Sequence, residues 1–206
     1  MFSGKKGFTL LELLIVIAIL AILASTTFVV LNPAEILRKT RDSQRIADLA
    51  SMRTALNYFV ANTSSPVLGS TSADGCTDQT NDYTYSAVPT FDISAPNTTE
   101  SASTSRAVNG SGWIPVALSS LQGGSPLSTW PIDPNPSDAS DRYYVYLCHA
   151  GNVTFTLFAN MESNTYAQGG ASDVESTDGG GFTRVYEVGT AFLGGTATSS
   201  SFYPAQ

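Results

Sequence analysis

The feature that most constrains this chain is an apolar run near its N-terminus. From Phe8 to Leu31 the sequence reads FTLLELLIVIAILAILASTTFVVL, and its only charged side chain is Glu12. As an α-helix the run would be about 36 Å long, enough to cross a hydrocarbon core of about 30 Å. A helix of this kind finds little in a chain of 206 residues to pack against. We therefore expect it to project beyond its own domain.

A secretory signal peptide is a competing interpretation of this run. Signal peptides have an apolar stretch of about 7–15 residues, followed by a small-x-small cleavage site. The run from Phe8 to Leu31 is longer and carries a carboxylate near its start. Its length therefore argues against a signal peptide, and a plain transmembrane anchor is the stronger alternative.

A second helical pattern, over residues 32–62, follows the apolar run after one interruption. Pro33 removes a helical hydrogen bond, so we expect a kink or a brief break at Asn32 and Pro33. The apolar residues then recur at spacings of three and four, as in an amphipathic helix. They are Ile46, Leu49, Met52, Leu56, Phe59 and Val60. Asp42 and Arg45 lie on adjoining turns, which predicts that the opposite face is polar.

Residues 63–206 have the composition of a turn-rich β domain. No glycine lies between Phe8 and Leu68, although the chain has 17, and nine of its 10 prolines follow residue 62. The best strand candidate is a hairpin of residues 143–149 and 153–161, whose second arm alternates as a half-buried strand does. Weaker candidates are residues 83–88, 113–118 and 184–189. Residues 98–105, 169–181 and the tail from residue 194 are expected to be loops. The predicted fold class is α+β, with a long N-terminal helix packed on a small antiparallel β-sheet.

Charge and residue counts exclude several functional classes. The chain has 10 Lys and Arg against 17 Asp and Glu, so it lacks the surplus of cations that binds nucleic acid. One histidine, His149, and two cysteines make a zinc site unexpected. No P-loop, Ser-His-Asp set or dinucleotide fingerprint occurs, and we do not expect an enzyme.

Residues 4–31 resemble the N-terminus of bacterial type IV prepilins and type II secretion pseudopilins. The family pattern is a short basic leader that ends in glycine, then Phe-Thr-Leu-x-Glu and an apolar helix. Every element is present here: Lys5, Lys6, Gly7, Phe8, Thr9, Leu10, Leu11 and Glu12. The layout of the remaining chain, a long helix that leads into a small sheet, also fits this family.

The resemblance implies a series of processing and assembly steps. Residues 1–7 would be a leader, removed after Gly7 by a prepilin peptidase, and the new N-terminal Phe8 would be methylated. Residues 8–31 would lie in the inner membrane and then in the core of a filament of identical subunits, built on an inner-membrane assembly platform. The filament would reach the cell surface, or would remain in the periplasm as a pseudopilus.

Glu12 is the candidate assembly residue, together with Phe8. An ionisable group in an apolar segment costs about 2.5–3.5 kcal/mol at the membrane centre, and its presence there indicates a function. Cleavage after Gly7 would create a cation, the Phe8 amine, at the edge of the same apolar layer. A filament core leaves no water for a lone charge, which favours pairing of the two. The alternative is that Glu12 reaches the lipid headgroups without a partner.

The distribution of cations conflicts with export of the β domain, residues 63–206, which we call the head. Lys and Arg are usually enriched on the cytoplasmic side of a membrane segment. The leader has Lys5 and Lys6, but the apolar run is closely followed by Arg38, Lys39, Arg41 and Arg45. This count places the head in the cytoplasm, whereas the family resemblance and the Ser/Thr-rich head of low charge favour export.

The two cysteines are candidates for a disulfide. Cys76 and Cys148 enclose 71 residues, and closing such a loop is worth about 4 kcal/mol in the chain-entropy estimate. An oxidising compartment would favour the bond. Many pilins carry a disulfide nearer the C-terminus, and two unpaired thiols are the alternative.

An acidic run from Trp130 to Asp141 is similar to the loop that binds calcium in major pseudopilins. Asp133, Asp138 and Asp141, with backbone carbonyls, could supply some of the six to eight oxygens that calcium prefers. The run lacks the glycine and the terminal glutamate of an EF-hand, and a solvated turn is the alternative. Calcium is the one cofactor that the sequence leaves open.

Three functions are compatible with these features. The first is a structural subunit of a type IV pilus-like filament. The second is a major pseudopilin of a type II secretion system, for which the acidic run is the specific support. The third is a minor pilin whose head binds a ligand in adhesion or DNA uptake. The anionic head argues against DNA, and its Tyr-rich strands leave a surface ligand open.

Overall fold

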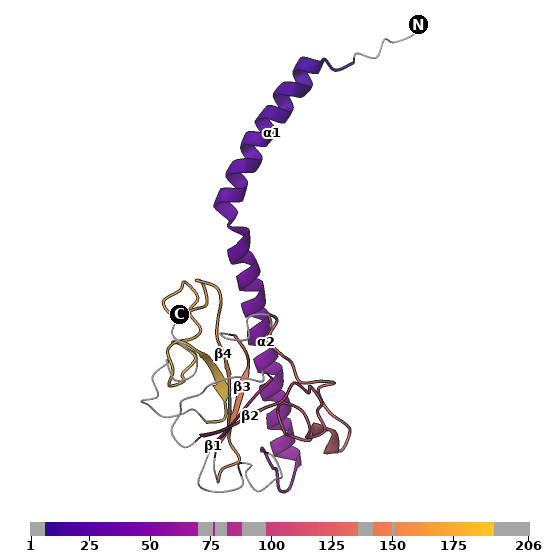
Figure 1. Ribbon diagram of the computed structural model, residues 1–206, viewed down its shortest axis with the longest axis vertical. Coiled ribbons are helices and arrows are strands. Elements are labelled where there is room, and N and C mark those ends of the chain that lie inside the picture. Colours follow the sequence, from indigo (N-terminus) through magenta and orange to yellow (C-terminus); the bar gives the residue numbers. More distant parts are fainter. Residues whose placement is uncertain are drawn as a thin grey trace. The chain divides into compact units, whose positions relative to one another are not determined.

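The computed structural model describes residues 7–69, 76, 82–87, 98–135, 142–149 and 151–191. The chain divides into two compact units, Met1–Arg38 and Lys39–Gln206. In chain order the elements are α1 (Leu10–Leu31), α2 (Pro33–Asn62), β1 (Asp82–Ser86), β2 (Thr98–Ala102), the short 3₁₀ helix η1 (Leu118–Ser120), β3 (Val145–Cys148), β4 (Phe155–Ala159) and β5 (Tyr186–Gly189) (Figure 1). The predicted α+β class is confirmed.

The break between α1 and α2 lies where the sequence predicts it. Asn32 caps the C-terminus of α1 in a left-handed conformation, with φ 39° and ψ 78°. Asparagine tolerates this conformation better than most residues do. Pro33 begins α2 at a position where a missing N–H costs little. The Asn32 carbonyl oxygen accepts hydrogen bonds from Glu35 N and Ile36 N at 3.0 and 3.3 Å, so it also starts the second helix.

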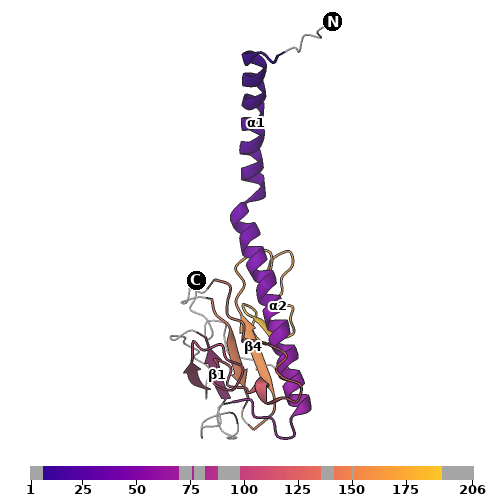
Figure 2. The ribbon, with the colours of Figure 1, turned by 90° about the vertical axis from the view of Figure 1, so that its right-hand side faces the viewer.

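Within the second unit, α2 runs alongside the sheet (Figures 1 and 2). Its buried apolar residues are Leu49, Met52, Ala55, Leu56 and Phe59. They share one core with side chains of the strands, among them Tyr85, Tyr146, Phe155, Leu157 and Val188. The amphipathic pattern of the sequence therefore predicts the face by which α2 packs.

The sheet has five strands in the order β2-β1-β3-β4-β5. The pairs β1–β3, β3–β4 and β4–β5 are antiparallel, whereas β1 and β2 are parallel. The predicted antiparallel sheet is therefore wrong at one edge, and the sheet is mixed. A parallel pair needs a connection that returns the chain to the same end of the sheet, because a tight hairpin turn joins only antiparallel strands.

Two local predictions differ from the structure. The sequence predicts a loop at Thr98–Ala102, which is the edge strand β2. It predicts a strand at residues 113–118. They instead form an irregular segment with one isolated bridge, between Asn109 and Ala117, and lead into η1. Trp113, Ile114, Val116 and Leu118 are buried, so the apolar run contributes to the core without joining the sheet. Pro115 lacks the N–H that a central strand would need.

β4 is covered on both faces, although its alternating sequence predicts a half-buried strand. All five of its residues are buried. Leu157 belongs to the core beneath α2. Phe158 contacts Phe182, with ring centroids 6.0 Å apart, and Met161, Phe182 and Val185 are buried as well. Chain segments that follow β4 therefore form a second layer on the sheet.

Carboxylates hold this second layer in place. The segment from residue 160 to 185 has no regular secondary structure, so its buried N–H groups need other acceptors. Glu175 accepts hydrogen bonds from Met161 N and Gln168 N, both at 2.9 Å. Glu187 on β5 accepts from Gly181 N and Phe182 N, both at 3.1 Å. Gly180 lies so close to the Glu187 carboxylate that a Cβ at this position would overlap it.

A disulfide joins Cys76 to Cys148, whose Cα atoms lie 5.9 Å apart. Cys148 is the last residue of β3, and both cysteines belong to the core beneath α2. Their pairing in the exported protein stays a prediction.

Glu187 predicts how stability varies with pH. Burial is the main cause that raises its pKa from 4.5 to about 7, and the nearby Asp178 charge adds to it. Between pH 4.5 and 7 the folded protein retains a proton that the unfolded chain has lost. Stability should therefore fall as pH rises through this window, on the order of 2–3 kcal/mol. Urea unfolding of full-length protein in detergent at several pH values measures this slope.

Glu187→Gln should flatten that slope, because glutamine does not titrate. Asp173→Asn is the control, since hydrogen bonds from Ser176 and Gly169 lower the Asp173 pKa to about 2, outside the window. An unchanged slope in Glu187→Gln would show that another group is responsible.

Candidate functional site at the N-terminal helix and the base of the head

The predicted assembly residue, Glu12, caps its own helix. Thr9 precedes α1 with an extended backbone, and Glu12 is the third residue of the helix. Thr9 N and Thr9 Oγ1 each donate to Glu12 Oε2 at 2.9 Å, and Glu12 N donates to Thr9 Oγ1 at 3.2 Å. This is a capping box, in which the two side chains satisfy N–H groups at the start of a helix. It directs the Glu12 carboxylate toward the N-terminus.

Thr9 is therefore a capping residue of α1 that the predictions from the sequence do not include. The Thr-x-x-Glu spacing before an apolar run is the signal that could have identified it. Glu12 Oε1 makes no hydrogen bond to any residue that the structure describes. It is the atom available to a second partner.

The predicted cleavage position lies directly before this cap. Gly7 and Phe8 are exposed and have no regular secondary structure. Phe8 is 89% exposed, and nothing lies within 4 Å of the place where a Cβ of Gly7 would be. The Gly7–Phe8 peptide bond is thus accessible to a protease. The leader residues Lys5 and Lys6 lie outside the described part of the chain.

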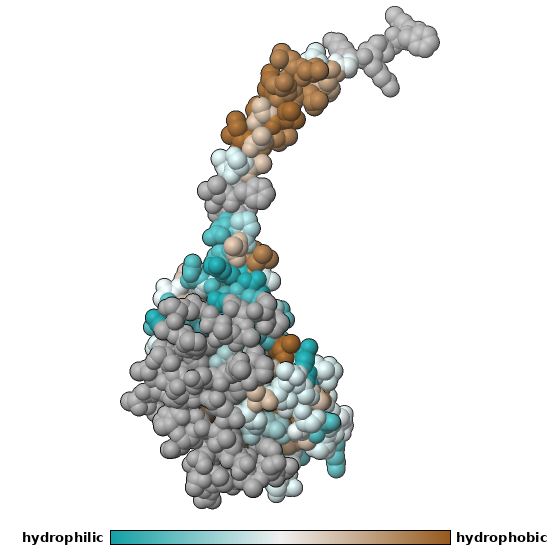
Figure 3. Space-filling model, viewed as in Figure 1, coloured by the Kyte–Doolittle hydropathy of each residue, from teal (hydrophilic) through white to brown (hydrophobic). Residues whose placement is uncertain are grey.

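Exposed apolar side chains follow one another almost without a break from Leu10 to Leu23 of α1, so they lie all around the helix. Figure 3 shows those on one face as a brown surface. Leu10–Thr27 is long and apolar enough to cross a membrane, and none of its residues is buried. The core helix of a soluble domain would be largely buried. A signal sequence near the N-terminus can also pass this test for a membrane-spanning helix. The apolar run from Phe8 to Leu31 is longer than the apolar stretch of about 7–15 residues in a signal peptide, which argues against a signal sequence.

A buried ionic cluster lies at the start of the second unit. Arg45 on α2 is fully buried. Its Nε and Nη2 atoms donate to the two oxygens of Asp133 at 2.7 and 2.8 Å. Nη1 donates to Asp42 Oδ1 at 2.7 Å, and Nη2 also donates to Glu162 Oε1 at 2.5 Å. The predicted polar face of α2 is therefore wrong at Asp42 and Arg45, because other segments of the head cover both.

The cluster ties three segments of the head together. Asp42 accepts hydrogen bonds from Glu162 N and Ser163 N at 2.9 and 2.8 Å. Arg41 also binds Glu162. Burial alone would raise the pKa of Glu162, but hydrogen bonds from Arg41 and Arg45 outweigh it and lower the pKa to about 2. Glu162 therefore stays ionised, and α2 remains fixed to residues 133 and 162–163.

Asp133 has a different role from the one that the calcium hypothesis gives it. Both of its oxygens bind Arg45, and Oδ1 also accepts a hydrogen bond from Asn135 N at 2.9 Å. Asp138 and Asp141 lie outside the described residues. The described part of the chain holds no group of three or more His, Cys, Asp and Glu that could bind a metal ion. The calcium site stays a prediction.

Removing Arg45 should destabilise the head strongly. In Arg45→Ala, Asp42, Asp133 and Glu162 would be left buried without their cation, at a cost of about 3–5 kcal/mol. The matched control is Arg53→Ala, an exposed arginine of the same helix, which should change stability by less than about 0.5 kcal/mol. Urea unfolding of the full-length protein, followed by fluorescence of the buried Trp113 and Trp130, compares them. Equal midpoints for the two variants would contradict the prediction.

Comparison with known proteins identifies the N-terminal segment. Residues 2–28 match the family model described as the prokaryotic N-terminal methylation motif. No curated protein and no solved structure matches the chain. The matched range contains the Gly7–Phe8 bond, the Thr9–Glu12 capping box and most of α1. The chain thus carries the prepilin-type N-terminal methylation motif, consistent with the type IV pilin and pseudopilin family.

Proposed function

We propose that this protein is the structural subunit of a type IV pilus-like filament. The observation that carries the proposal is an apolar helix, α1, whose residues Leu10–Thr27 are all exposed and which follows directly on an accessible Gly7–Phe8 bond. The methylation motif implies cleavage by a prepilin peptidase and filament assembly at a membrane. Copies of α1 in a filament core would bury the apolar surface that one chain leaves exposed.

A pseudopilin of a type II secretion system would use the same helix in a shorter, periplasmic assembly. Its specific support was the acidic run, and Asp133 of that run is bound to Arg45 instead. We therefore favour the pilus-like filament. Electron microscopy of sheared surface material, with mass spectrometry of the fibres, separates the two.

Processing of the N-terminus provides one test of the proposal. Mature protein should begin at Phe8 and carry one N-terminal methyl group, because the exposed bond after Gly7 lies within the methylation motif. Intact mass of protein extracted from the membrane tests this. A strain without prepilin peptidase is the control and should yield the chain with its leader. A mature chain that starts at Met1 or Phe2, or one cut after Ala24, would contradict the prediction.

A further prediction separates the charge of Glu12 from its capping function. We propose that Glu12 pairs with the Phe8 amine of a neighbouring subunit and so sets the register of the filament. Glutamine can replace glutamate in a capping box. Glu12→Gln should therefore keep α1 capped and lose only the charge pair. The subunit should insert and be cleaved normally, whereas fibre yield should fall at least about tenfold, given a register penalty of about 3–5 kcal/mol.

Glu12→Ala and Thr9→Ala complete the test. Glu12→Ala removes both the charge and the cap, and Thr9→Ala removes only the threonine hydroxyl. Inner-membrane protein and surface fibre are quantified separately in each strain. Normal fibre yield and subunit spacing in Glu12→Gln, with loss only in Glu12→Ala, would show that the cap rather than the charge matters.

A further inference from the structure

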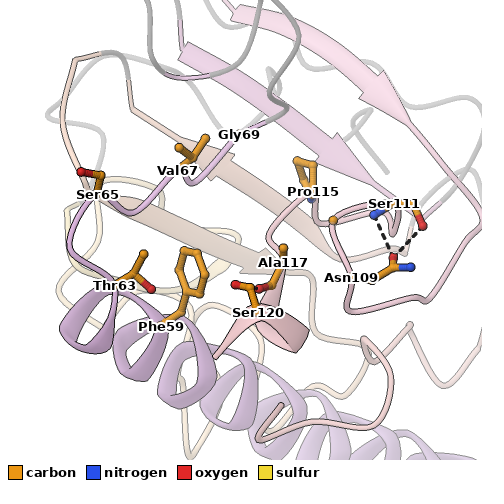
Figure 4. A pocket seen from close by; sticks show the side chains of 11 residues that line it. Phe59, Thr63, Ser65, Val67, Gly69, Asn109, Ser111, Pro115, Ala117 and Ser120 are labelled. Atoms are coloured by element: carbon orange, nitrogen blue, oxygen red, sulfur yellow. Dashed lines mark hydrogen bonds between the residues drawn. The ribbon is translucent and has the colours of Figure 1, made fainter. Parts of the chain in front are cut away.

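The second unit contains a hollow at the C-terminal end of α2 whose volume is about 510 Å³. One wall is formed by Phe59 and by the segment that follows α2, up to Gly69. The opposite wall is the segment from Asn109 to Ser120 (Figure 4). Cavities of about 300–1,000 Å³ hold small organic ligands.

The hollow exists because its walls carry small side chains. Of the lining residues that the structure describes, Phe59 alone has a large side chain, and it is 4% exposed, so it forms part of the floor. The rest are Thr63, Ser65, Val67, Gly69, Asn109, Gly110, Ser111, Pro115, Ala117 and Ser120. Val67 and Pro115 add apolar surface, and the hydroxyl and amide groups add polar surface. The lining therefore suits a ligand that has both apolar and polar faces.

Among the described residues that line the hollow, no side chain is charged, although residues 63–206 contain 13 anionic and three cationic residues. An anionic ligand would meet no cation in the hollow and would be repelled by the rest of the head. A cationic ligand would find no carboxylate to bind in the hollow. Charge therefore selects a neutral ligand.

Several polar groups of the lining are free to bind a ligand. The Thr63 and Ser65 hydroxyls make no hydrogen bond to any described residue. Asn109 Oδ1 accepts from Ser111 N and Ser111 Oγ at 3.1 and 2.7 Å, which leaves the Asn109 amide nitrogen available as a donor. A hydroxyl group both donates and accepts, so it matches a ligand that is itself rich in hydroxyl groups.

The wall that carries Asn109 is preformed. An antiparallel bridge joins Asn109 to Ala117. Gly110 has φ +94°, a conformation that other residues rarely adopt. A site whose groups are already in place loses less conformational entropy when a ligand binds.

We propose that this hollow binds a neutral saccharide, whose C–H faces lie against Phe59 and Val67 and whose hydroxyl groups bind Thr63, Ser65 and Asn109. The inference goes beyond the filament function, because the hollow lies wholly within the second unit and is independent of α1. It assigns a ligand class to the head of a subunit whose N-terminal helix drives assembly.

Saturation-transfer NMR on the mature full-length protein tests the proposal. The protein is kept in a zwitterionic detergent that has no sugar headgroup. The probes are the methyl glycosides of glucose, galactose, mannose and N-acetylglucosamine, with glucose 6-phosphate as the charged counterpart of glucose. We expect at least one glycoside to bind with a dissociation constant on the order of 1 mM, as a small ligand with few contacts does. We also expect glucose 6-phosphate to bind at least about tenfold more weakly than the methyl glucoside.

Two exposed serines of η1 provide a matched pair of variants. Ser120 lines the hollow and Ser119 does not. Ser120→Trp should fill the hollow and weaken binding at least about tenfold, whereas Ser119→Trp should bind as the wild type does. Thr63→Val, which loses one hydrogen bond, should weaken binding about threefold to tenfold.

Three results would overturn the proposal: no glycoside of the panel binds, Ser120→Trp binds as well as Ser119→Trp, or glucose 6-phosphate binds as well as the methyl glucoside. Fibre yield of the Ser120→Trp strain is measured in parallel and should be normal. A wild-type strain that makes no fibres, with intact saccharide binding by the protein, would count against the filament function and leave this site standing.

Discussion

An apolar helix that no other segment of its own chain covers leaves its side chains exposed to water, and this exposed surface is the main constraint on the molecule. α1 buries none of the residues in its membrane-length window, and the head has its own closed core beneath α2. The unsatisfied surface must therefore be covered by lipid or by other copies of α1. A membrane-inserted subunit that later polymerises meets both conditions in succession. Because the head folds on its own contacts, it would not need to change in the proposed filament, where α1 would exchange lipid for neighbouring helices.

The buried ionic cluster fixes α2 to the rest of the head. Arg45 is bound to Asp42, Asp133 and Glu162, so the first turns of α2 within the second unit are fixed to two other segments. The cluster also bears on the conflict between the cation count and export. Of the four cations that follow the apolar run, Arg41 and Arg45 are neutralised within the folded head. Arg38 forms an ion pair with Glu35, in which Arg38 Nη1 lies 3.8 Å from Glu35 Oε2. A count made on the sequence therefore overstates the positive charge that the folded protein presents.

The features that could be predicted from the sequence depend on local patterns. The two helices, the break at Asn32 and the strands of the central hairpin follow from periodicity and from one proline. The edge strand β2 could not be predicted, because its sequence, TTESA, lacks the alternation of apolar and polar residues that marks a strand. In the described sheet β2 pairs with β1 alone. The burial of Asp42 and Arg45 could not be predicted either. Arg45 binds Asp133 and Glu162, which lie 88 and 117 residues away along the chain, and no local pattern reveals such partners.

At the proposed assembly site, sequence and structure contribute different parts of the proposed mechanism. The sequence identifies Glu12 as a carboxylate in a place where a lone charge is costly. The structure adds that Thr9 holds this carboxylate at the start of the helix through Oε2, which leaves Oε1 for another donor. A carboxylate has room for both, because its two oxygens offer about four acceptor positions. In the proposed filament, the capping box would therefore not compete with a neighbour's Phe8 amine. It would orient the charge before the neighbour arrives, which would lower the entropy lost on pairing. Uniform apolar contacts along α1 would supply most of the attraction but favour no particular register. A charge fixed in position by its own helix would supply the register that those contacts lack.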